Sequence, residues 1–367
     1  SKTIYQYSTA LNTKTLDLST GSVFEITPTS DIEVALSNPA SSGTSSGATL
    51  LLDGGVAASY DIANAAYDSK SFDVGQDATP IGIHISTDGT KMFIIGFDTD
   101  TVYEYNLSTP YDMSSASYNS VSLDVNSQAS SPKGITFKSD GTKMYVLDTS
   151  AVYQYALSTA WNLSTASYES KTLNVLSQSA NSRGIQLSND GTSLFVGSIS
   201  LTDGVFQYTL STAFDISTGS YASKFLNVIS QASEMSDFDF NSDGTKVFVV
   251  DYDDNDVHQY SLSTAFDIST ASYDSIVFDP SEGHASSCRG MTFADSGNKL
   301  YQLINTGTEV YQYNTATPAT ITYPSTLKWP SGTAPTSPAI GDTDVITFNT
   351  IDGGTTYKSV VAIDGAS

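Results

Sequence analysis

Short apolar runs separated by turn residues recur along most of the chain. Between residues 134 and 155, the runs GITF, KMYVL and VYQY are separated by the turn Asp140-Gly141 and a short polar link. Short runs rich in β-branched and aromatic residues, bounded by Gly, Asp and Ser, are typical of β-strands. No segment sustains the i, i+3, i+4, i+7 apolar pattern of an amphipathic helix. The pattern therefore predicts an all-β protein.

These runs belong to a unit that occurs five times. The tyrosine of a recurring S-Y-x-S phrase, varied in some copies, marks the units at Tyr67, Tyr118, Tyr168, Tyr221 and Tyr273, with spacings of 51, 50, 53 and 52 residues. The turn phrase S-D-G-T-K and the strand phrase V-Y-x-Y also recur, with small variations. Each unit contains four predicted strands, and repeated four-stranded units are typical of β-propellers.

The order of the predicted strands favours a closed ring of five blades. The repeat region opens with a strand of the fourth type, residues 69–74, and ends with strands of the first three types, residues 290–293, 299–303 and 310–313. Pairing the opening strand with the last one completes the fifth blade and satisfies the backbone of both edges. The alternative, an open solenoid, would need capping repeats. Closure also brings entry and exit together, so the ring can be an insertion in another domain.

The segments on either side of the repeats contain further predicted strands. They cover residues 15–18, 23–27, 32–36 and 49–52 before the repeats, and 320–323, 326–329, 345–348 and 356–362 after them. Each half alone is too small to bury a good core, so we expect the two to join in one small antiparallel β-sandwich. The predicted domains are residues 1–55 and 318–367 for this β-sandwich base and 56–317 for the propeller.

The charge balance narrows the classes of partner. The chain has 15 Lys+Arg and 39 Asp+Glu residues, a formal net charge of −24. Phosphate neutralisation needs Lys and Arg, so no nucleic-acid partner is expected. No apolar run approaches the roughly 18 residues of a membrane-spanning helix, so no membrane insertion is expected. Lysines gather in the S-D-G-T-K turns, opposite the Asp-rich loops, and this predicts that one face of the ring is acidic.

A ring of polar residues is predicted inside the central channel. Side chains alternate between faces along a strand. With the apolar residues of the innermost strands packed between blades, the intervening residues face inward, and these are His84, Thr136, Gln186, Asp239 and Thr292. Convergent polar groups in a concave site are typical of small-ligand or ion sites. The alternative is a water-filled channel without a ligand.

The loops between the second and third strands of the units are rich in aspartate. The most acidic is residues 251–256 (DYDDND), which supplies Tyr252, Asp253 and Asp254. Such loops can provide the oxygen ligands that Ca²⁺ prefers, although no EF-hand motif is present. The alternative is that short Asp and Asn side chains stabilise turns and keep the protein soluble. Tyr252 departs from the repeat pattern and offers a flat face on which a sugar can stack.

Signatures of enzymes are absent from the sequence. The three histidines, His84, His258 and His284, belong to different units, and no G-x-S-x-G, H-E-x-x-H or P-loop motif occurs. Five-bladed propellers occur among glycosidases, but these need two carboxylates, and only Asp239 is predicted on the channel ring. We therefore expect a protein that is not an enzyme and needs no cofactor, with a propeller-type glycoside hydrolase as the weakest alternative.

The repeats resemble those of structural proteins of tailed bacteriophages, often described as tail-fibre-like. The resemblance rests on LSTAWNLSTASYES, SPKGITFKSDGTKMYVLD and VYQYALSTA in the repeats. The flanks at residues 16–43 and 326–360, the latter with the phrases WPSGTAPT and DGGTTY, are similar to the two half-domains of such proteins. Together these segments extend over nearly all of residues 11–363. The family implies a virion structural role and supplies no catalytic residues.

The resemblance implies a virion protein of the tail-fibre or receptor-binding type, with the propeller attaching to host-surface glycan. A capsid decoration or head-fibre protein is the alternative from the structural class. Other virion proteins are the expected partners, and the particle surface is the expected location. Fibre-like assemblies are often trimeric, but no heptad or collagen-like stretch specifies a trimer here.

Overall fold

The computed structural model describes residues 3–7, 12–19, 23–27, 32–53, 56–57, 60–199, 203–280, 287–304, 308–318, 320–330, 332–337 and 343–366. His284 lies outside these residues. The chain divides into two compact units, residues 60–315 and residues 1–59 with 316–367. Strands dominate both units, which confirms the all-β prediction, and the part of the chain that is described holds no helix suited to crossing a membrane.

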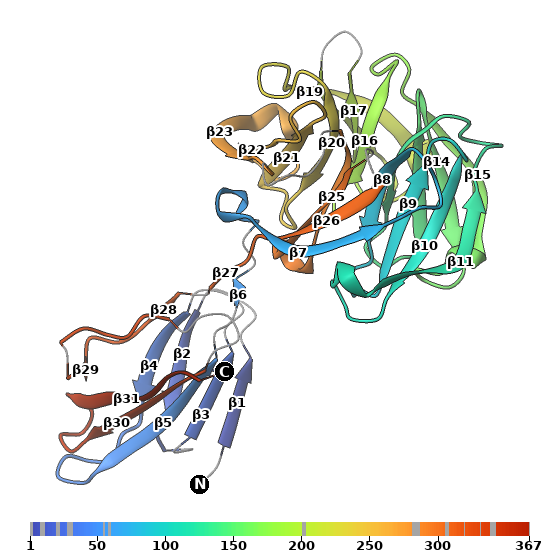
Figure 1. The fold of residues 1–367 in the computed structure, drawn as a ribbon. Coiled ribbons are helices and arrows are strands. Elements are labelled where there is room, and N and C mark those ends of the chain that lie inside the picture. Colours follow the sequence, from blue (N-terminus) through green and yellow to red (C-terminus); the bar gives the residue numbers. More distant parts are fainter. Residues whose placement is uncertain are drawn as a thin grey trace. The chain divides into compact units, whose positions relative to one another are not determined.

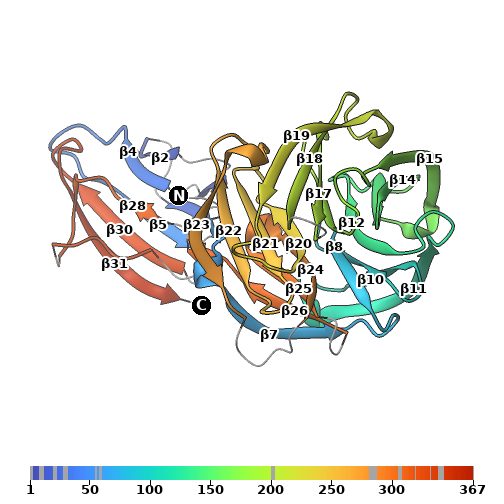
Figure 2. The same cartoon turned by 90° about the horizontal axis from the view of Figure 1, so that it is seen from above.

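Residues 60–315 form a five-bladed β-propeller, as the sequence predicts (Figures 1 and 2). Each blade is a four-stranded antiparallel sheet. From the innermost strand outward, the blades are β8 (Pro80–Ile85), β9 (Lys91–Gly96), β10 (Thr101–Leu107) and β11 (Ala116–Asp124); β12 (Pro132–Phe137), β13 (Lys143–Asp148), β14 (Ala151–Leu157) and β15 (Ala166–Asn174); β16 (Ser182–Leu187), β17 (Ser193–Ser198), β18 (Gly204–Leu210) and β19 (Gly219–Asn227); β20 (Met235–Phe240), β21 (Lys246–Asp251), β22 (Val257–Leu262) and β23 (Ala271–Phe278); and β24 (Cys288–Ala294), β25 (Lys299–Ile304), β26 (Glu309–Asn314) and β7 (Ala66–Asp73). β8, β12, β16, β20 and β24 are innermost because each packs against its equivalents in the two neighbouring blades.

The fifth blade closes the ring by joining two segments far apart in the sequence. β7 pairs antiparallel with β26, with Tyr67 opposite Tyr313 and Asp73 opposite Glu309. Figure 1 shows β7 in blue beside β26 in orange. The predicted closure is confirmed, and it satisfies the backbone of two strands that would otherwise be free edges.

A short 3₁₀ turn precedes the outer strand of each blade and packs against the outer strand of the preceding blade in the ring. The turns are η1 (Ile62–Asn64), η2 (Met113–Ser115), η3 (Leu163–Thr165), η4 (Ile216–Thr218) and η5 (Ile268–Thr270). Asp or Asn caps four of them, as when the Asn162 side chain accepts a hydrogen bond of 3.1 Å from the Ser164 backbone N–H. This geometry explains the recurring phrase D/N-x-S-T, because the short polar side chain satisfies a backbone donor that the turn leaves open.

An aromatic residue lies over the glycine of each S-D-G hairpin. Trp161 occupies this place above Gly141, and a Cβ on Gly141 would lie 2.4 Å from the indole ring. Equivalent pairs are Tyr111 with Gly89, Phe214 with Gly191, Phe266 with Gly244 and Tyr60 with Gly297. A sixth 3₁₀ turn, η6 (Asp295–Gly297), replaces the simple hairpin in the fifth blade. The aromatic ring therefore requires glycine for space, and the glycine also takes a positive φ of 71° at position 141.

The second unit is a two-sheet β-sandwich built from both chain ends. One sheet has the order β1 (Thr3–Tyr7), β3 (Val23–Thr27), β5 (Ser46–Asp53), β30 (Thr343–Thr350), β31 (Tyr357–Ala366) and β29 (Leu327–Lys328). The other contains β2 (Asn12–Asp17), β4 (Ile32–Ser37) and β28 (Ile321–Thr322), while β6 (Val56–Ala57) pairs with β27 (Thr317–Pro318). Leu16 and Val34 from the smaller sheet share a core with Phe24, Leu50 and Phe348 from the larger.

The strand directions in this base differ from the antiparallel prediction. β1, β3 and β5 run parallel to one another, as do β2 and β4, while β5, β30 and β31 pair antiparallel. Successive strands from β1 to β5 alternate between the two sheets, so each returns to its own sheet in the same direction. The alternation of apolar and polar residues is identical in both directions, which is why the sequence pattern alone did not distinguish them.

Candidate functional site

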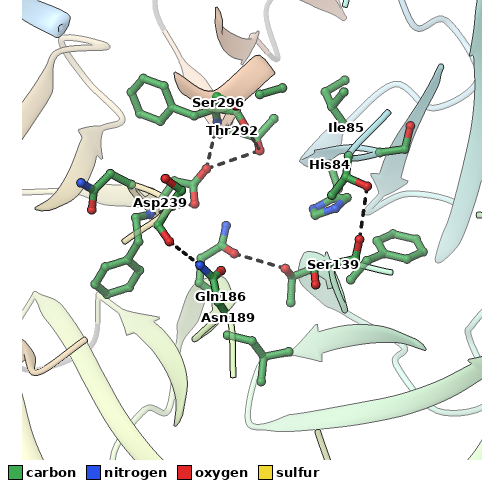
Figure 3. A pocket seen from close by; sticks show the side chains of 18 of the residues that line it. His84, Ile85, Ser139, Gln186, Asn189, Asp239, Thr292 and Ser296 are labelled. Atoms are coloured by element: carbon green, nitrogen blue, oxygen red, sulfur yellow. Dashed lines mark hydrogen bonds between the residues drawn. The ribbon is translucent and has the colours of Figure 1, made fainter. Parts of the chain in front are cut away.

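The five residues predicted to face the channel line one pocket. His84, Thr136, Gln186, Asp239 and Thr292 each occupy the fifth position of the innermost strand of a blade, or its equivalent in β24. They surround a cavity of about 320 Å³ at the end of the channel formed by the S-D-G hairpins (Figure 3). The structure therefore brings all five together, and their role in binding a ligand stays a prediction.

Two hydrogen-bonded pairs organise the polar ring. The Thr136 hydroxyl donates a hydrogen bond of 3.2 Å to Gln186 Oε1, and the Thr292 hydroxyl lies 3.4 Å from Asp239 Oδ2 (Figure 3). Thr136 and Thr292 are buried, while Gln186 is half-buried. The ring thus presents both donors and acceptors whose positions are fixed by neighbouring strands.

His84 is held in the ring by aromatic contacts. Its imidazole lies 5.8 Å from the Trp161 ring at an interplanar angle of 19° and 5.0 Å from the Phe137 ring. Burial lowers the pKa of His84 from 6.5 to about 4. The imidazole is therefore neutral at pH 7 and can offer one donor and one acceptor to a ligand.

Asp239 has a partner on the same face that the sequence analysis missed. Asp237 precedes it by two residues in β20, and both carboxylates are buried. Each carboxylate accepts one hydrogen bond from a backbone N–H of its own strand and one from a backbone N–H of β24. The donors to Asp237 are Phe238 and Met291, both at 2.9 Å. The donors to Asp239 are Phe240 at 2.8 Å and Phe293 at 2.9 Å. The signal was available, because the other four blades have Gly82, Gly134, Gly184 and Gly290 at the position of Asp237.

Burial raises the pKa of both carboxyls, to about 8 for Asp237 and about 7 for Asp239. The backbone donors act in the opposite direction, toward the ionised form. Because all four oxygens accept from backbone N–H groups, the pair fastens the seam between the fourth and fifth blades. Only Asp239 lines the pocket.

Aromatic and hydroxyl side chains surround the polar ring. The rings of Tyr60, Tyr111, Phe214 and Phe266, the residues that cover the hairpin glycines, line the pocket wall. The rim is formed by small polar residues, among them Ser86, Thr87, Ser139, Ser188, Asn189, Asn241, Ser242 and Ser296. Flat apolar faces beside neutral donors and acceptors suit a polyhydroxylated ligand such as a sugar.

Tyr252, Asp253 and Asp254 lie away from the polar ring. They belong to the loop after β21, at the other end of the blade from the S-D-G hairpins. Tyr252 is half-buried under the Arg289 guanidinium, whereas Asp253 and Asp254 are exposed. The predicted site residues therefore form two groups at opposite ends of the channel, the polar ring and the acidic loop, as the sequence analysis placed them.

The acidic loop uses one of its carboxylates within its own turn. Asp251 Oδ1 accepts hydrogen bonds from the Asp253 and Asp254 backbone N–H groups, at 2.7 and 3.4 Å. Within the residues that are described, no three His, Cys, Asp or Glu side chains gather where they could hold a metal ion. The Asp251 carboxylate therefore stabilises the turn of its own loop, and calcium binding by the loop stays a prediction.

A second pocket lies near Tyr252, and the sequence analysis missed it. Lys133, Arg183 and Arg289, with Thr79, Ile81 and Phe97, line a cavity of about 220 Å³. The repeats contained a signal for this pocket. Lys133, Arg183 and Arg289 occupy equivalent positions, each as the second residue of an innermost strand. The face expected to be acidic therefore has a cationic centre.

Comparisons with known proteins add only fold likenesses. No protein-family model matches this chain, and no curated protein matches it. Two solved structures are proteins described provisionally as 6-phosphogluconolactonases, from Bacteroides uniformis at 15% identity and Bacteroides fragilis at 16%, each with a TM-score of 0.39. The matches cover 55% of this chain and 55% of the first protein, and 59% and 58% for the second. A Lactobacillus plantarum protein is similar at 17% identity, with 53% of each chain covered and a TM-score of 0.39.

Proposed function

We propose that this chain is a structural protein of a tailed bacteriophage virion, of the tail-fibre or receptor-binding type, and that its propeller binds host-surface glycan. The sequence resemblance supports the virion role. The observation that carries the binding role is the pocket lined by His84, Thr136, Gln186, Asp239 and Thr292. Its volume of about 320 Å³ accommodates one or two sugar rings.

The chemistry of the pocket supports a neutral carbohydrate ligand. His84 is uncharged at pH 7, Thr136 and Gln186 present a hydroxyl and an amide, and burial favours the neutral form of Asp239. Neutral donors and acceptors can exchange hydrogen bonds with sugar hydroxyls without the desolvation cost of a buried charge. The aromatic wall supplies faces against which the C–H groups of a sugar can pack.

The fold supports display on a particle. The propeller enters and leaves its base through adjacent strands, β6 and β27, which pair with each other. A closed ring has few exposed strand edges, so it can be presented at a surface without edge-to-edge association. This arrangement suits a recognition domain carried by a separate anchoring domain.

Glycan binding is tested with an array of neutral bacterial surface oligosaccharides and purified full chain. We expect selective binding that a Thr136→Val, Gln186→Leu double variant loses by about tenfold or more, because two hydrogen bonds to the ligand are removed. Ser122→Ala, an exposed substitution on the outer strand β11, serves as the matched control and keeps full binding. Absence of any glycan signal, or equal binding by the double variant, would refute the glycan role.

The virion role is tested on particles of a phage that encodes the chain. Gold-labelled antibody should decorate the tail, and deletion of residues 60–315 should abolish host adsorption while particles still assemble. Label on the head together with unchanged adsorption would instead support the capsid decoration or head-fibre alternative. Particles without label would contradict both.

A further inference from the structure

Three cationic side chains converge at the channel end opposite the polar ring. Lys133, Arg183 and Arg289 come from β12, β16 and β24 and line the same cavity of about 220 Å³. Only two arginines occur in the whole chain, and both are here. In a protein with 39 acidic and 15 basic residues, such a gathering does not follow from composition.

In the described part of the chain, these cations form no ion pair with a carboxylate. Seven lysines of the propeller form ion pairs with Asp or Glu, but among the described residues none of the three cavity cations does. Asp148 acts electrostatically on Lys133, and Glu234 acts on Arg183. Neither acid forms an ion pair with its cation.

The contacts of the two arginines hold them in place and leave donors open. Arg183 Nη1 donates hydrogen bonds to Asn181 Oδ1 at 2.7 Å and to the Ser182 carbonyl at 2.8 Å. The Arg289 guanidinium lies 4.2 Å above the Tyr252 ring and donates from Nη2 to the Tyr252 hydroxyl at 3.1 Å. Arg289 Nε is buried and finds no hydrogen-bond partner among the residues that the structure describes. A buried donor without a partner is costly, and a ligand oxygen would satisfy it.

Like charges held together also cost folding free energy. Burial, followed by repulsion from Arg183 and Arg289, lowers the pKa of Lys133 to about 8. Burial and Arg289 lower the pKa of Arg183 as well. A bound anion would remove this repulsion, because its negative charge interacts favourably with all three cations.

The remaining walls suit an organic group attached to the anion. Phe97 is a large apolar side chain with 36% of its surface exposed, and the Lys133 ammonium lies 4.3 Å from its ring centre. Ile81 forms the adjoining wall. A cavity of this volume is larger than a phosphate ion needs, so a small apolar-faced group such as a sugar ring fits beside the anion.

We propose that this cavity binds the phosphate group of a phosphorylated sugar or a similar phosphate monoester. Arginine presents a planar array of donors that matches phosphate oxygens, and lysine supplies a point charge. A dianion best balances three cations. This site is separate from the glycan pocket at the other channel end, and its proposal stands whether or not that pocket binds glycan.

Isothermal titration of the full chain tests the site with three probes: inorganic phosphate, glucose 1-phosphate and glucose. We expect glucose 1-phosphate to bind more tightly than inorganic phosphate and glucose not to bind at this site. Arg289→Gln and Arg183→Gln should each weaken phosphate binding about tenfold or more, because each removes a charge-assisted hydrogen bond. Lys246→Gln is the matched control: it removes the same charge at the start of β21, at the hairpin end of a blade, and should leave binding unchanged.

Thermal unfolding without ligand separates a binding role from a structural one. Lys133→Met keeps an unbranched chain beside Phe97 and removes one of three repelling charges, so the variant should be as stable as the original protein or more stable. It should also lose most of the stabilisation that phosphate confers. No heat with either phosphate probe at millimolar concentration would overturn the proposal. Binding of phosphate by both arginine variants as tight as that of the original protein would also overturn it. So would a Lys133→Met variant that is clearly less stable than the original protein and gains the same stabilisation from phosphate.

Glucuronate provides the last arm of the experiment. Its single carboxylate should bind more weakly than glucose 1-phosphate, since it carries one negative charge for three cations. Tighter binding of glucuronate than of either phosphate probe would refute the phosphate assignment.

Discussion

The Gln154 side-chain oxygen accepts a hydrogen bond of 3.0 Å from the backbone N–H of Ile216, which lies 62 residues further along in the next blade. Equivalent hydrogen bonds connect other blades. The backbone N–H groups of Leu163, Ile268 and Met113 donate to side-chain oxygens of Glu104, Gln207 and Gln312, at 2.8, 3.2 and 2.8 Å respectively. The acceptor is always the third residue of the V-Y-x-Y phrase. This residue therefore fastens one blade to the next.

Replacing Gln154 with leucine should lower the free energy of unfolding by about 1–3 kcal/mol. The substitution leaves the Ile216 N–H buried without its acceptor, and it removes the hydrogen bond of 2.6 Å to Glu169. Urea unfolding of Gln154→Leu measures the change, with the exposed Ser122→Ala as reference. A loss no larger than that of the reference would show that the hydrogen bond between the blades contributes little.

Replacing Gly141 with alanine should destabilise the protein more than replacing Gly43. Both glycines have positive φ, 71° and 90°, so both substitutions carry the same kind of backbone strain of roughly 1–2 kcal/mol. A Cβ on Gly141 also meets the Trp161 ring at 2.4 Å, whereas a Cβ on Gly43 meets nothing within 4 Å. Chemical unfolding, followed separately for the two units, measures the difference. Equal losses would mean that the aromatic ring moves aside at no cost.

The stability of the propeller should fall as the pH rises from 6.5 to 8. Asp237 and Asp239 have pKa values of about 8 and about 7 in the folded chain, above the usual value of 3.8. In this range the unfolded chain has lost these protons and the folded chain still holds them in part, so raising the pH favours unfolding. Below pH 6.5 the lowered pKa of His84, about 4, acts in the opposite direction. The range from 6.5 to 8 therefore isolates the two carboxyls from the histidine.

Asp237→Asn tests the origin of this pH dependence. The amide cannot lose a proton, so the variant should have a flatter slope between pH 6.5 and 8, by about 1 kcal/mol per pH unit. Its absolute stability should also be lower, because one of two accepted backbone hydrogen bonds is lost. Urea midpoints across the pH range give both values. A slope equal to that of the original protein would contradict a raised pKa at Asp237.

Sulfate binding at the cationic cavity should weaken as the pH rises through about 8. Burial and repulsion from Arg183 and Arg289 lower the pKa of Lys133 to about 8 in the free protein, while Asp148 acts in the opposite direction. Loss of its proton removes one of three charges that attract the anion. Sulfate keeps its charge throughout, so titrations between pH 6.5 and 9 report on the protein alone. Lys133→Met should bind sulfate weakly at every pH, and a decline that persists in this variant would assign the effect elsewhere.

The repeat pattern was enough to predict most of the propeller. Strand phrases of period 2, Asp-Gly hairpins and five unit copies indicate five blades, and the spare strand at residues 69–74 indicates how the ring closes. The same alternation identified which side chains of the innermost strands face the channel. These inferences succeeded because strand geometry is local and repeats five times, so each unit supports the others.

The strand directions of the base could not be predicted from local sequence patterns. Its strands alternate between two sheets and therefore run parallel within each sheet, although apolar alternation is the same for either direction. Asp237 and the three cavity cations were missed for a related reason. Asp237 departs from the repeat, whereas the three cations recur at one position of it, and in both cases the role depends on contacts between different units.

The sequence by itself determined the fold class, the blade number, the ring closure and the five residues of the polar ring, because these depend on periodicities that neighbouring residues express. Only the tertiary structure decided that Lys133, Arg183 and Arg289 share one cavity, that Tyr252 lies beneath Arg289 and that Asp237 fastens two blades. These relationships join residues about 40 to 160 positions apart, and closure of the ring is what brings their side chains together.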